Sequence, residues 1–233
     1  MRSSRWIAPR LRWLAAGLAA ALLAALSVAY LDRPSAYWAS ELAPPVVAFC
    51  ERLTALGNSS WYLVPLAVAI PVLHVASSRS ADPARAARLD WLLWAALFLF
   101  VAIAGSGLLT DLLKILFGRA RPALLLREGD FGWHPLGLTA KLQSFPSGHA
   151  NTVTTVTLAL GMLAPRLRKA LAALAALVLL SRVAVGEHYP SDLIAGAAVA
   201  FGTTLPLRAA FARHGRVFRR TEGGEFIPGG IAD

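Results

Sequence analysis

The chain has 233 residues, of which 57% are hydrophobic and only 15% are charged, so its composition is far from that of a soluble globular protein. We therefore interpret it as an integral membrane protein. The formal net charge is +10, but the cations lie in short segments between apolar runs, and no basic stretch with interleaved aromatic residues indicates a nucleic-acid partner. The single cysteine, Cys50, excludes an internal disulfide, and no zinc-ligand spacing occurs.

Six apolar runs approach the ~20 residues that cross a bilayer as a helix. They are Trp13 to Leu31, Trp61 to Ala76, Trp91 to Phe117, His149 to Ala164, Ala170 to Val185 and Asp192 to Leu207. We expect an all-α protein, a six-span transmembrane helical bundle. The first run is longer than the core of a secretory signal, so we expect it to be retained as a span, although Ser27-Val28-Ala29 resembles a cleavage site.

The cations predict how the chain is oriented, because cytoplasmic loops carry an excess of Lys and Arg. Most of them precede the first run or follow the second, fourth and sixth runs, at Arg2, Arg5, Arg10, Arg12, Arg79, Arg85, Arg88, Arg166, Arg168, Lys169, Arg208, Arg213, Arg216, Arg219 and Arg220. We expect a multi-pass protein of the plasma (inner) membrane with both termini in the cytoplasm. The opposite ends of the spans would face the periplasm or exterior.

The chain divides into three predicted parts. Residues 1–90 hold the first two spans and an interfacial segment, residues 91–207 hold spans three to six, and residues 208–233 form a basic cytoplasmic tail with a mobile end. The interfacial segment has apolar residues at helical spacing after Pro44-Pro45, at Val46, Phe49, Cys50, Leu53 and Leu56. We expect it to lie on the membrane surface as a packing linker, with a lid over a lipid-access route as the alternative.

Three polar stretches interrupt the outer ends of the predicted spans. They are Lys114 to Pro122, Phe145 to His149 and Ser181 to Asp192. Ionisable residues at membrane depth are costly and are usually paired or functional, so these stretches predict a site. On a helix of ~1.5 Å per residue Arg182 lies about 21 Å from Arg168, which places it a little below the outer boundary of the hydrocarbon. Two histidines outside these stretches, His74 and His134, are interpreted as interfacial or surface residues.

The residue types in these stretches suit a bound phosphate. Lys114, Arg121 and Arg182 would compensate its charge together with the first-turn amides that follow Ser147 and Gly148 at a helix start. Phosphoryl transfer also needs an in-line nucleophile and a proton for the leaving oxygen, and two histidines can divide those roles.

The two histidines can be told apart by their neighbours. Asp192 follows His188 by four residues, close enough around a helix start to orient that imidazole as the nucleophile. His149 is then left as the general acid. No cluster of carboxylates offers a metal site, so we expect neither a metal nor another cofactor.

The three stretches together resemble the signature of the type 2 phosphatidic acid phosphatase superfamily. The matching pieces are Lys114…Arg121-Pro122, Pro146-Ser147-Gly148-His149 and Ser181-Arg182…His188…Asp192, in the same order and spacing. The resemblance covers roughly residues 91–207. It implies a helical core shared with haloperoxidases, a phosphohistidine formed by His188 with help from Asp192, protonation of the leaving group by His149, and a phosphoryl group held by Lys114, Arg121, Ser147, Gly148 and Arg182. Arg119, inside the first piece, is left out of this assignment.

These inferences predict a metal-independent membrane phosphatase that acts on a lipid phosphate or diphosphate at the outer face of a plasma membrane. Polyprenyl diphosphate, phosphatidylglycerol phosphate, phosphatidic acid and lipid A are all compatible, and polyprenyl diphosphate is slightly preferred. Two alternatives remain at this stage. One is a vanadate-dependent haloperoxidase-like enzyme, and the other is a non-catalytic protein that binds or transports lipid phosphates. The sequence gives no indication of an oligomeric state.

Overall fold

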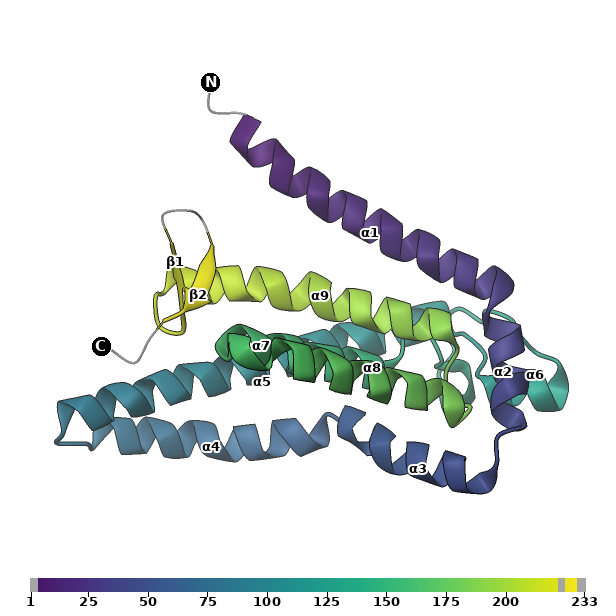
Figure 1. Cartoon of the computed structure of the whole chain (residues 1–233), viewed down its shortest axis with the longest axis horizontal. Coiled ribbons are helices and arrows are strands. Elements are labelled where there is room, and N and C mark those ends of the chain that lie inside the picture. The colour runs from purple at the N-terminus through teal and green to yellow at the C-terminus, as the bar shows by residue number, and fades with distance from the viewer. Residues whose placement is uncertain (1–3, 222–224, 230–233) are drawn as a thin grey trace.

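The computed structural model describes residues 4–221 and 225–229 and is dominated by helices (Figure 1). The helices are α1 (Ser4–Tyr30), α2 (Asp32–Ser40), α3 (Pro44–Thr54), η1 (Ala55–Gly57), α4 (Ser60–Ser78), α5 (Pro83–Phe117), α6 (Pro122–Glu128), η2 (Ala140–Leu142), α7 (Gly148–Leu163), η3 (Pro165–Leu167), α8 (Arg168–Ala184) and α9 (Pro190–Arg213). Two short strands, β1 (Phe218–Arg220) and β2 (Phe226–Pro228), follow them.

Local sequence signals set the ends of the main helices. Helix α5 begins at Pro83 after Asp82, whose side chain accepts a hydrogen bond from the amide of Ala84, and it ends at Gly118, which has φ of 60°. Helix α7 begins after Ser147, whose hydroxyl accepts from the amide of Ala150. Residues next to the helix ends therefore determine where the polar stretches begin relative to α5 and α7.

Helix α7 lies at the centre of the bundle, between α5, α8 and α9, and most of its residues are buried. Small and hydroxylated side chains allow this close packing. Asn151 donates to the hydroxyl of Ser106 on α5 at 3.1 Å, and that hydroxyl also pairs with Thr155 at 3.2 Å. Because these buried polar atoms have partners, they join α5 to α7.

Each apolar run predicted as a span lies within a helix, to within one residue at its end, namely α1, α4, α5, α7, α8 and α9. Among the described residues, four stretches are both long enough and apolar enough to cross a membrane: Trp13–Tyr30, Pro44–Ser78, Pro83–Phe117 and Pro190–Arg213. Helices α7 and α8 have only 16 and 17 residues, about 24 and 26 Å at 1.5 Å per residue. The helical bundle is confirmed, and a count of six crossings is not.

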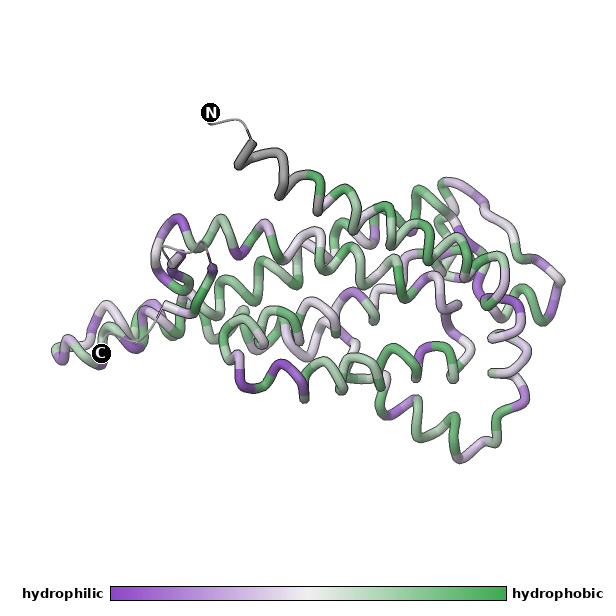
Figure 2. Tube along the Cα trace, turned by 45° about the horizontal axis from the view of Figure 1, so that its top comes forward, coloured by the Kyte–Doolittle hydropathy of each residue, from purple (hydrophilic) through white to green (hydrophobic). Residues whose placement is uncertain are grey.

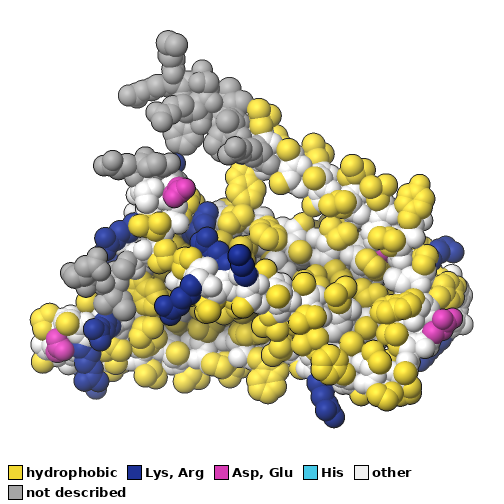
Figure 3. Space-filling model, viewed as in Figure 1, with side chains coloured by type: hydrophobic (Ala, Val, Ile, Leu, Met, Phe, Trp, Pro, Cys, Tyr) yellow, Lys and Arg dark blue, Asp and Glu magenta, His cyan; other side chains and the backbone are white. Residues whose placement is uncertain are grey.

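The exterior of the bundle matches a bilayer. Hydrophobic residues run along the helices, and hydrophilic residues gather at the turns (Figure 2). In the space-filling view the flanks are largely apolar, and Lys and Arg gather at the end that carries the strands and the α4–α5 turn (Figure 3). Exposed leucines on α1, such as Leu18 and Leu22, extend this apolar surface.

The segment between the first two predicted spans is more closely packed than we expected. Helices α3 and η1 lead into α4, and α3 packs against α8 (Figure 1). Leu53 contacts the buried cluster of Val153, Ala175 and Val178. The interpretation as a packing linker therefore describes α3 better than that of a separate surface lid, and Pro44–Ser78 reads as one apolar stretch.

The tail forms structure that we did not predict. Strand β1 pairs antiparallel with β2, and Phe218 packs edge-on against Phe98 of α5 at a centroid distance of 4.9 Å. Contacts therefore cross the proposed boundary at residue 207, although the three-part division of the chain stays a prediction. The expected mobile end of the tail, residues 230–233, lies outside the described residues.

Helices α7 and α9 approach most closely at Gly196, which gives a test of this packing. A Cβ added at Gly196 would lie 2.5 Å from the backbone oxygen of Ser147, too close without a backbone shift. We expect Gly196→Ala to destabilise the protein by about 1–3 kcal/mol through overpacking, measured by thermal unfolding in detergent.

Gly202→Ala on the same helix is the matched control, because nothing lies within 4 Å of its added Cβ. Equal unfolding temperatures for the two variants would contradict the close contact between α7 and α9.

Candidate active site

The three polar stretches of the sequence meet at the end of the bundle opposite the strands (Figure 1). They contribute the segment between α5 and α6, the start of α7, and the connection from α8 to α9. Hydrogen bonds join these pieces directly. The amide of Ser147 donates to the main-chain oxygen of Asp192 at 3.0 Å, and the amide of Ser144 donates to that of Arg119 at 3.1 Å.

His188 and Asp192 form a buried pair at the start of α9. The distance from Nδ1 of His188 to Oδ2 of Asp192 is 3.5 Å, and the two side chains are 2% and 0% exposed. This distance is longer than an ordinary hydrogen bond, as is common for catalytic groups without substrate. Because Nδ1 faces the carboxylate, Nε2 is the nitrogen available for attack.

The environment of His188 keeps its imidazole neutral. Burial lowers the pKa of His188, and the cations of Arg121 and Arg182 add to this effect, while Asp192 opposes it. A neutral imidazole has a free lone pair on one nitrogen, which a nucleophile needs.

Asp192 is held by donors from all sides. Its Oδ2 accepts from the hydroxyl of Ser144 at 2.6 Å and from the amide of Tyr189 at 2.9 Å, and its Oδ1 accepts from Nη1 of Arg119 at 2.6 Å. The carboxylate therefore has little rotational freedom. A fixed carboxylate is what a base-orienting role requires.

Two arginines converge on one acidic side chain beside His188. Nη1 of Arg121 pairs with Oε2 of Glu187, and Nη2 of Arg182 lies 3.8 Å from the same oxygen. Arg182 is 6% exposed, and its Nη1 donates to the hydroxyl of Thr54 at 3.0 Å. The Nε atoms of Arg121 and Arg182 have no hydrogen-bond partner among the described residues. The pair is thus a cationic cup that holds a carboxylate here and has donors left for a larger anion.

The start of α7 forms the other side of the cup. Lys114 lies over this helix end, since a Cβ added at Gly148 would be 3.0 Å from its Nζ. Lys114 also pairs with exposed Asp111 at 3.2 Å. His149, the next residue of α7, is within electrostatic range of Arg182, His188, Lys114 and Arg121. All eight site residues predicted from the sequence therefore lie in one region.

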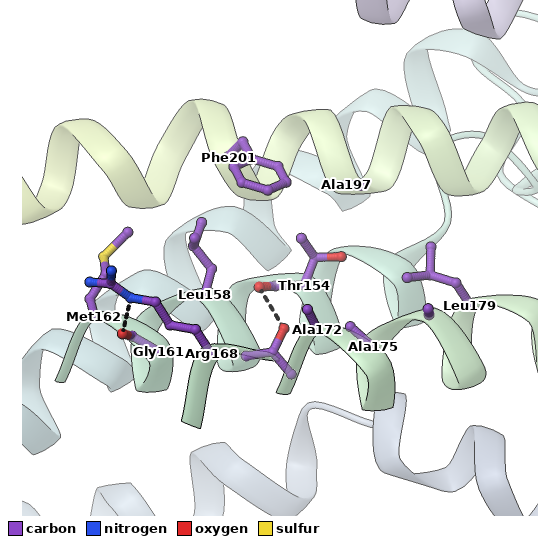
Figure 4. A pocket seen from close by; sticks show the side chains of 12 residues that line it. Thr154, Leu158, Gly161, Met162, Arg168, Ala172, Ala175, Leu179, Ala197 and Phe201 are labelled. Atoms are coloured by element: carbon purple, nitrogen blue, oxygen red, sulfur yellow. Dashed lines mark hydrogen bonds between the residues drawn. The ribbon is translucent and has the colours of Figure 1, made fainter. Parts of the chain in front are cut away.

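A polar pocket of about 200 Å³ opens next to His149. It is lined by residues of η1 and of the turn that follows it, of α5 and of α7, including Asn58, Thr110, Asp111, Lys114 and Thr152. A separate groove of about 430 Å³ lies between α7, α8 and α9, where Leu158, Leu179 and Phe201 line it and Arg168 stands at one end (Figure 4). The groove holds none of the predicted site residues, and its apolar walls do not suit a phosphate.

Several site residues were missed by the sequence analysis. Arg119 is fully buried and contacts Asp192, and Asp32, at the start of α2, contacts Arg119. Gly57 lies against the imidazole of His149, because a Cβ added there would be 2.8 Å from Cβ of His149. Only Arg119 carried a local signal, its position within the first motif.

The outlying histidine behaves as expected. Nε2 of His134 pairs with Oδ2 of Asp130 at 2.8 Å, with both side chains partly exposed. Within the described residues no group of three or more His, Cys, Asp or Glu gathers as a metal site.

Comparison with known proteins agrees with this geometry. Residues 95–216 match the PAP2 superfamily. The chain is 38% identical over 214 residues to a lipid A 1-phosphatase of Rhizobium etli, covering 91% of this chain and 90% of that protein. It is 37% identical to a lipid A 1-phosphatase of Rhizobium johnstonii, over 91% and 86% of the two chains.

A solved structure adds the fold. It is a transmembrane PAP2-type phosphatidylglycerolphosphate phosphatase from Bacillus subtilis, which superposes with a TM-score of 0.60 at 20% identity and covers 86% of this chain and 96% of that one. The motifs, their convergence and these matches lead to one conclusion: the chain belongs to the PAP2 superfamily.

Proposed function

We propose that this protein is a membrane lipid phosphatase in which His188 attacks the phosphorus of a lipid phosphate. The observation that carries the proposal is the cup itself: the imidazole of His188, which faces the carboxylate of Asp192, lies beside two arginines that already hold a carboxylate. The phosphoryl group takes the place of the Glu187 carboxylate. Its oxygens accept from Arg121, Arg182, Lys114 and the first amides of α7 after Ser147 and Gly148, which spread its charge.

In the first step Nε2 of His188 forms a bond to phosphorus while the bond from phosphorus to the lipid oxygen breaks. His149 gives its proton to that oxygen, and Asp192 stabilises the imidazolium character that develops on His188. In the second step His149 takes a proton from water, the water oxygen bonds to phosphorus, and the phosphorus–nitrogen bond breaks. Inorganic phosphate and free His188 result. Positively charged side chains supply the charge compensation throughout, so no metal is required.

The charge distribution supports an orientation. Lys and Arg gather at the end of the bundle with the strands (Figure 3), and the positive-inside rule assigns that end to the cytoplasm. Both termini then lie in the cytoplasm of a plasma (inner) membrane, and the cup faces the periplasm or exterior. The headgroup of a lipid in the outer leaflet reaches the cup while its acyl chains remain in the bilayer.

The pocket beside His149 bears on the substrate, because the leaving group lies on the side of the general acid. Its lining of Asn58, Thr110, Asp111 and Thr152 offers hydrogen bonds to hydroxyl groups, which suits a sugar better than a prenyl chain. Two relatives at 37–38% identity are named lipid A 1-phosphatases. We therefore favour a phosphorylated glycolipid of the lipid A class over the polyprenyl diphosphate preferred from the sequence.

Variants of the two histidines test the chemistry. In detergent with EDTA present, the wild-type protein should release phosphate from lipid A or another lipid phosphate in a panel. His188→Ala should abolish release, and His149→Ala should lower it by about 100- to 10,000-fold, the usual contribution of a general acid. A substrate with a good leaving group, p-nitrophenyl phosphate, should restore much of the rate of His149→Ala and none of that of His188→Ala.

His134→Ala is the matched control, since this histidine lies outside the cup. Turnover of the lipid by His188→Ala at the wild-type rate would contradict the assignment of His188 as the nucleophile. Loss of all wild-type activity in EDTA would contradict the metal-independent mechanism.

Glu187 should compete with the substrate for the two arginines. Its side chain is 46% exposed, so the competing ion pair is worth only about 0.2–1 kcal/mol. Glu187→Gln should therefore lower the inhibition constant for inorganic phosphate by about 1.4- to 5-fold, measured by competition against lipid hydrolysis.

Glu128→Gln is the control for a change of net charge alone, because Glu128 is exposed at the end of α6. Weaker phosphate inhibition in Glu187→Gln than in this control would mean that Glu187 assists binding and that the cup holds phosphate elsewhere.

A further inference from the structure

A buried ion network lies behind the His188–Asp192 pair and reaches the end of the first span. Nη1 of Arg119 donates to Oδ1 of Asp192 at 2.6 Å, and Nη2 donates to Oδ2 of Asp32 at 2.7 Å. All three side chains are 0% exposed. The guanidinium thus bridges two carboxylates that are far apart in the sequence.

Asp32 has further partners that fix its position. Its Oδ1 accepts from the hydroxyl of Ser27 at 2.7 Å and from the amide of Ser191 at 3.1 Å. The hydroxyl of Ser191 lies between Asp32 and Arg119 and contacts both. Ser191 is the residue next to Asp192, so the carboxylate of Asp32 is held against the same helix turn that carries the proposed base-orienting group.

Aromatic rings enclose the guanidinium on its remaining sides. Its Cζ lies 4.4 Å from the ring centroid of Tyr189, 4.9 Å from that of Trp133 and 5.3 Å from that of Phe131. Arginine is weakly hydrated and stacks on aromatic faces, so it tolerates this enclosure. Because the rings and the burial exclude water, the effective dielectric constant is low and the interactions between the charges are strong.

The charge balance of the network explains why a second carboxylate is present. If Arg119 paired with Asp192 alone, the guanidinium would neutralise the carboxylate that faces His188. With Asp32 on its other side, two carboxylates surround one guanidinium and one net negative charge remains. This charge is complementary to the positive charge that develops on His188 when it bonds to phosphorus.

We propose that Asp32 and Arg119 are positioning residues that act on the reaction through Asp192: Arg119 fixes the carboxylate, and Asp32 offsets the charge of Arg119 so that Asp192 remains available to His188. The inference rests on the proposed function, since it concerns the step at His188. It also assigns the residue at the end of the first span a part in a reaction whose motifs begin more than 80 residues later.

Asp32→Asn tests the proposal, because it keeps the shape of the side chain and removes its charge. We expect kcat on the lipid substrate to fall by about 10- to 100-fold, the usual effect of removing a group that orients a functional residue without contacting the substrate. KM should change by less than about twofold. Loss of a negative charge also makes protonation of His188 less favourable, so the acid limb of the kcat/KM profile should move to lower pH.

The pH profile is compared with that of the wild type on the same substrate, so the ionisation of the substrate cancels. Other charged groups that face His188 are the same in both proteins: Asp192 from α9, Arg121 before α6, Arg182 from α8, His149 from α7 and the neighbouring Glu187. Asp90→Asn is the matched control, since Asp90 pairs with Arg216 at 3.0 Å on the exposed surface, and it should leave both kcat and the acid limb unchanged.

A wild-type kcat in Asp32→Asn would overturn the proposal. A lower kcat with an unmoved acid limb would overturn it too, because a purely structural role lowers the amount of active protein without changing the pH dependence of kcat/KM. If Asp32→Asn fails to fold, Ser191→Ala decides, because it removes the hydroxyl that contacts both Asp32 and Arg119 and keeps every charge. We then expect kcat to fall while the acid limb stays at the wild-type pH, and either a wild-type kcat or a shifted acid limb would overturn the proposal. Failure of the proposed function is distinct, since the wild-type protein would then release no phosphate.

Discussion

The structure depends on the burial of one carboxylate, that of Asp192. A fully buried carboxylate is costly unless donors surround it, and here Ser144, Tyr189 and Arg119 supply them from three separate segments. The main-chain oxygen of Asp192 also accepts from Ser147, at the start of α7. Satisfying this one group therefore brings together the starts of α7 and α9 and the segment before α6. The orientation of His188 follows from the same contacts.

Close backbone approach is the second condition for this site. Gly196 lets α9 contact the start of α7, and Gly148 lets Lys114 lie over the helix end. Gly57 leaves room for the imidazole of His149, although it belongs to the segment before α4. A side chain at any of these positions would move a group of the cup.

Much of the fold and the core of the site could be predicted because their signals are local. Each apolar run predicts a helix. The four-residue spacing of His188 and Asp192 is enough by itself to predict that the carboxylate lies beside the imidazole. Asp32, Thr54 and Gly57 have no such signal, since their roles arise only from contacts with residues more than 80 positions away. The short strands were missed for a different reason: three residues each are too few to show an alternating pattern. The count of six crossings stays a prediction, because α7 and α8, with 16 and 17 residues, are not among the four stretches that are long and apolar enough to cross a membrane.

The arginines of the site differ in how deeply they and their counter-ions are buried in the protein. Arg121 and Arg182 are compensated by Glu187, whose carboxylate is about half exposed. Arg119 is enclosed, so its compensation is permanent and comes from Asp32 and Asp192. The three arginines of the site therefore differ: the counter-ion of Arg121 and Arg182 is partly exposed, and the two counter-ions of Arg119 are fully buried. The imidazole of His188 faces the fixed carboxylate of Asp192 at 3.5 Å. In the proposed reaction the incoming anion would approach it from the side of Arg121 and Arg182, so that the negative charge of the network would stabilise the positive charge that develops on His188.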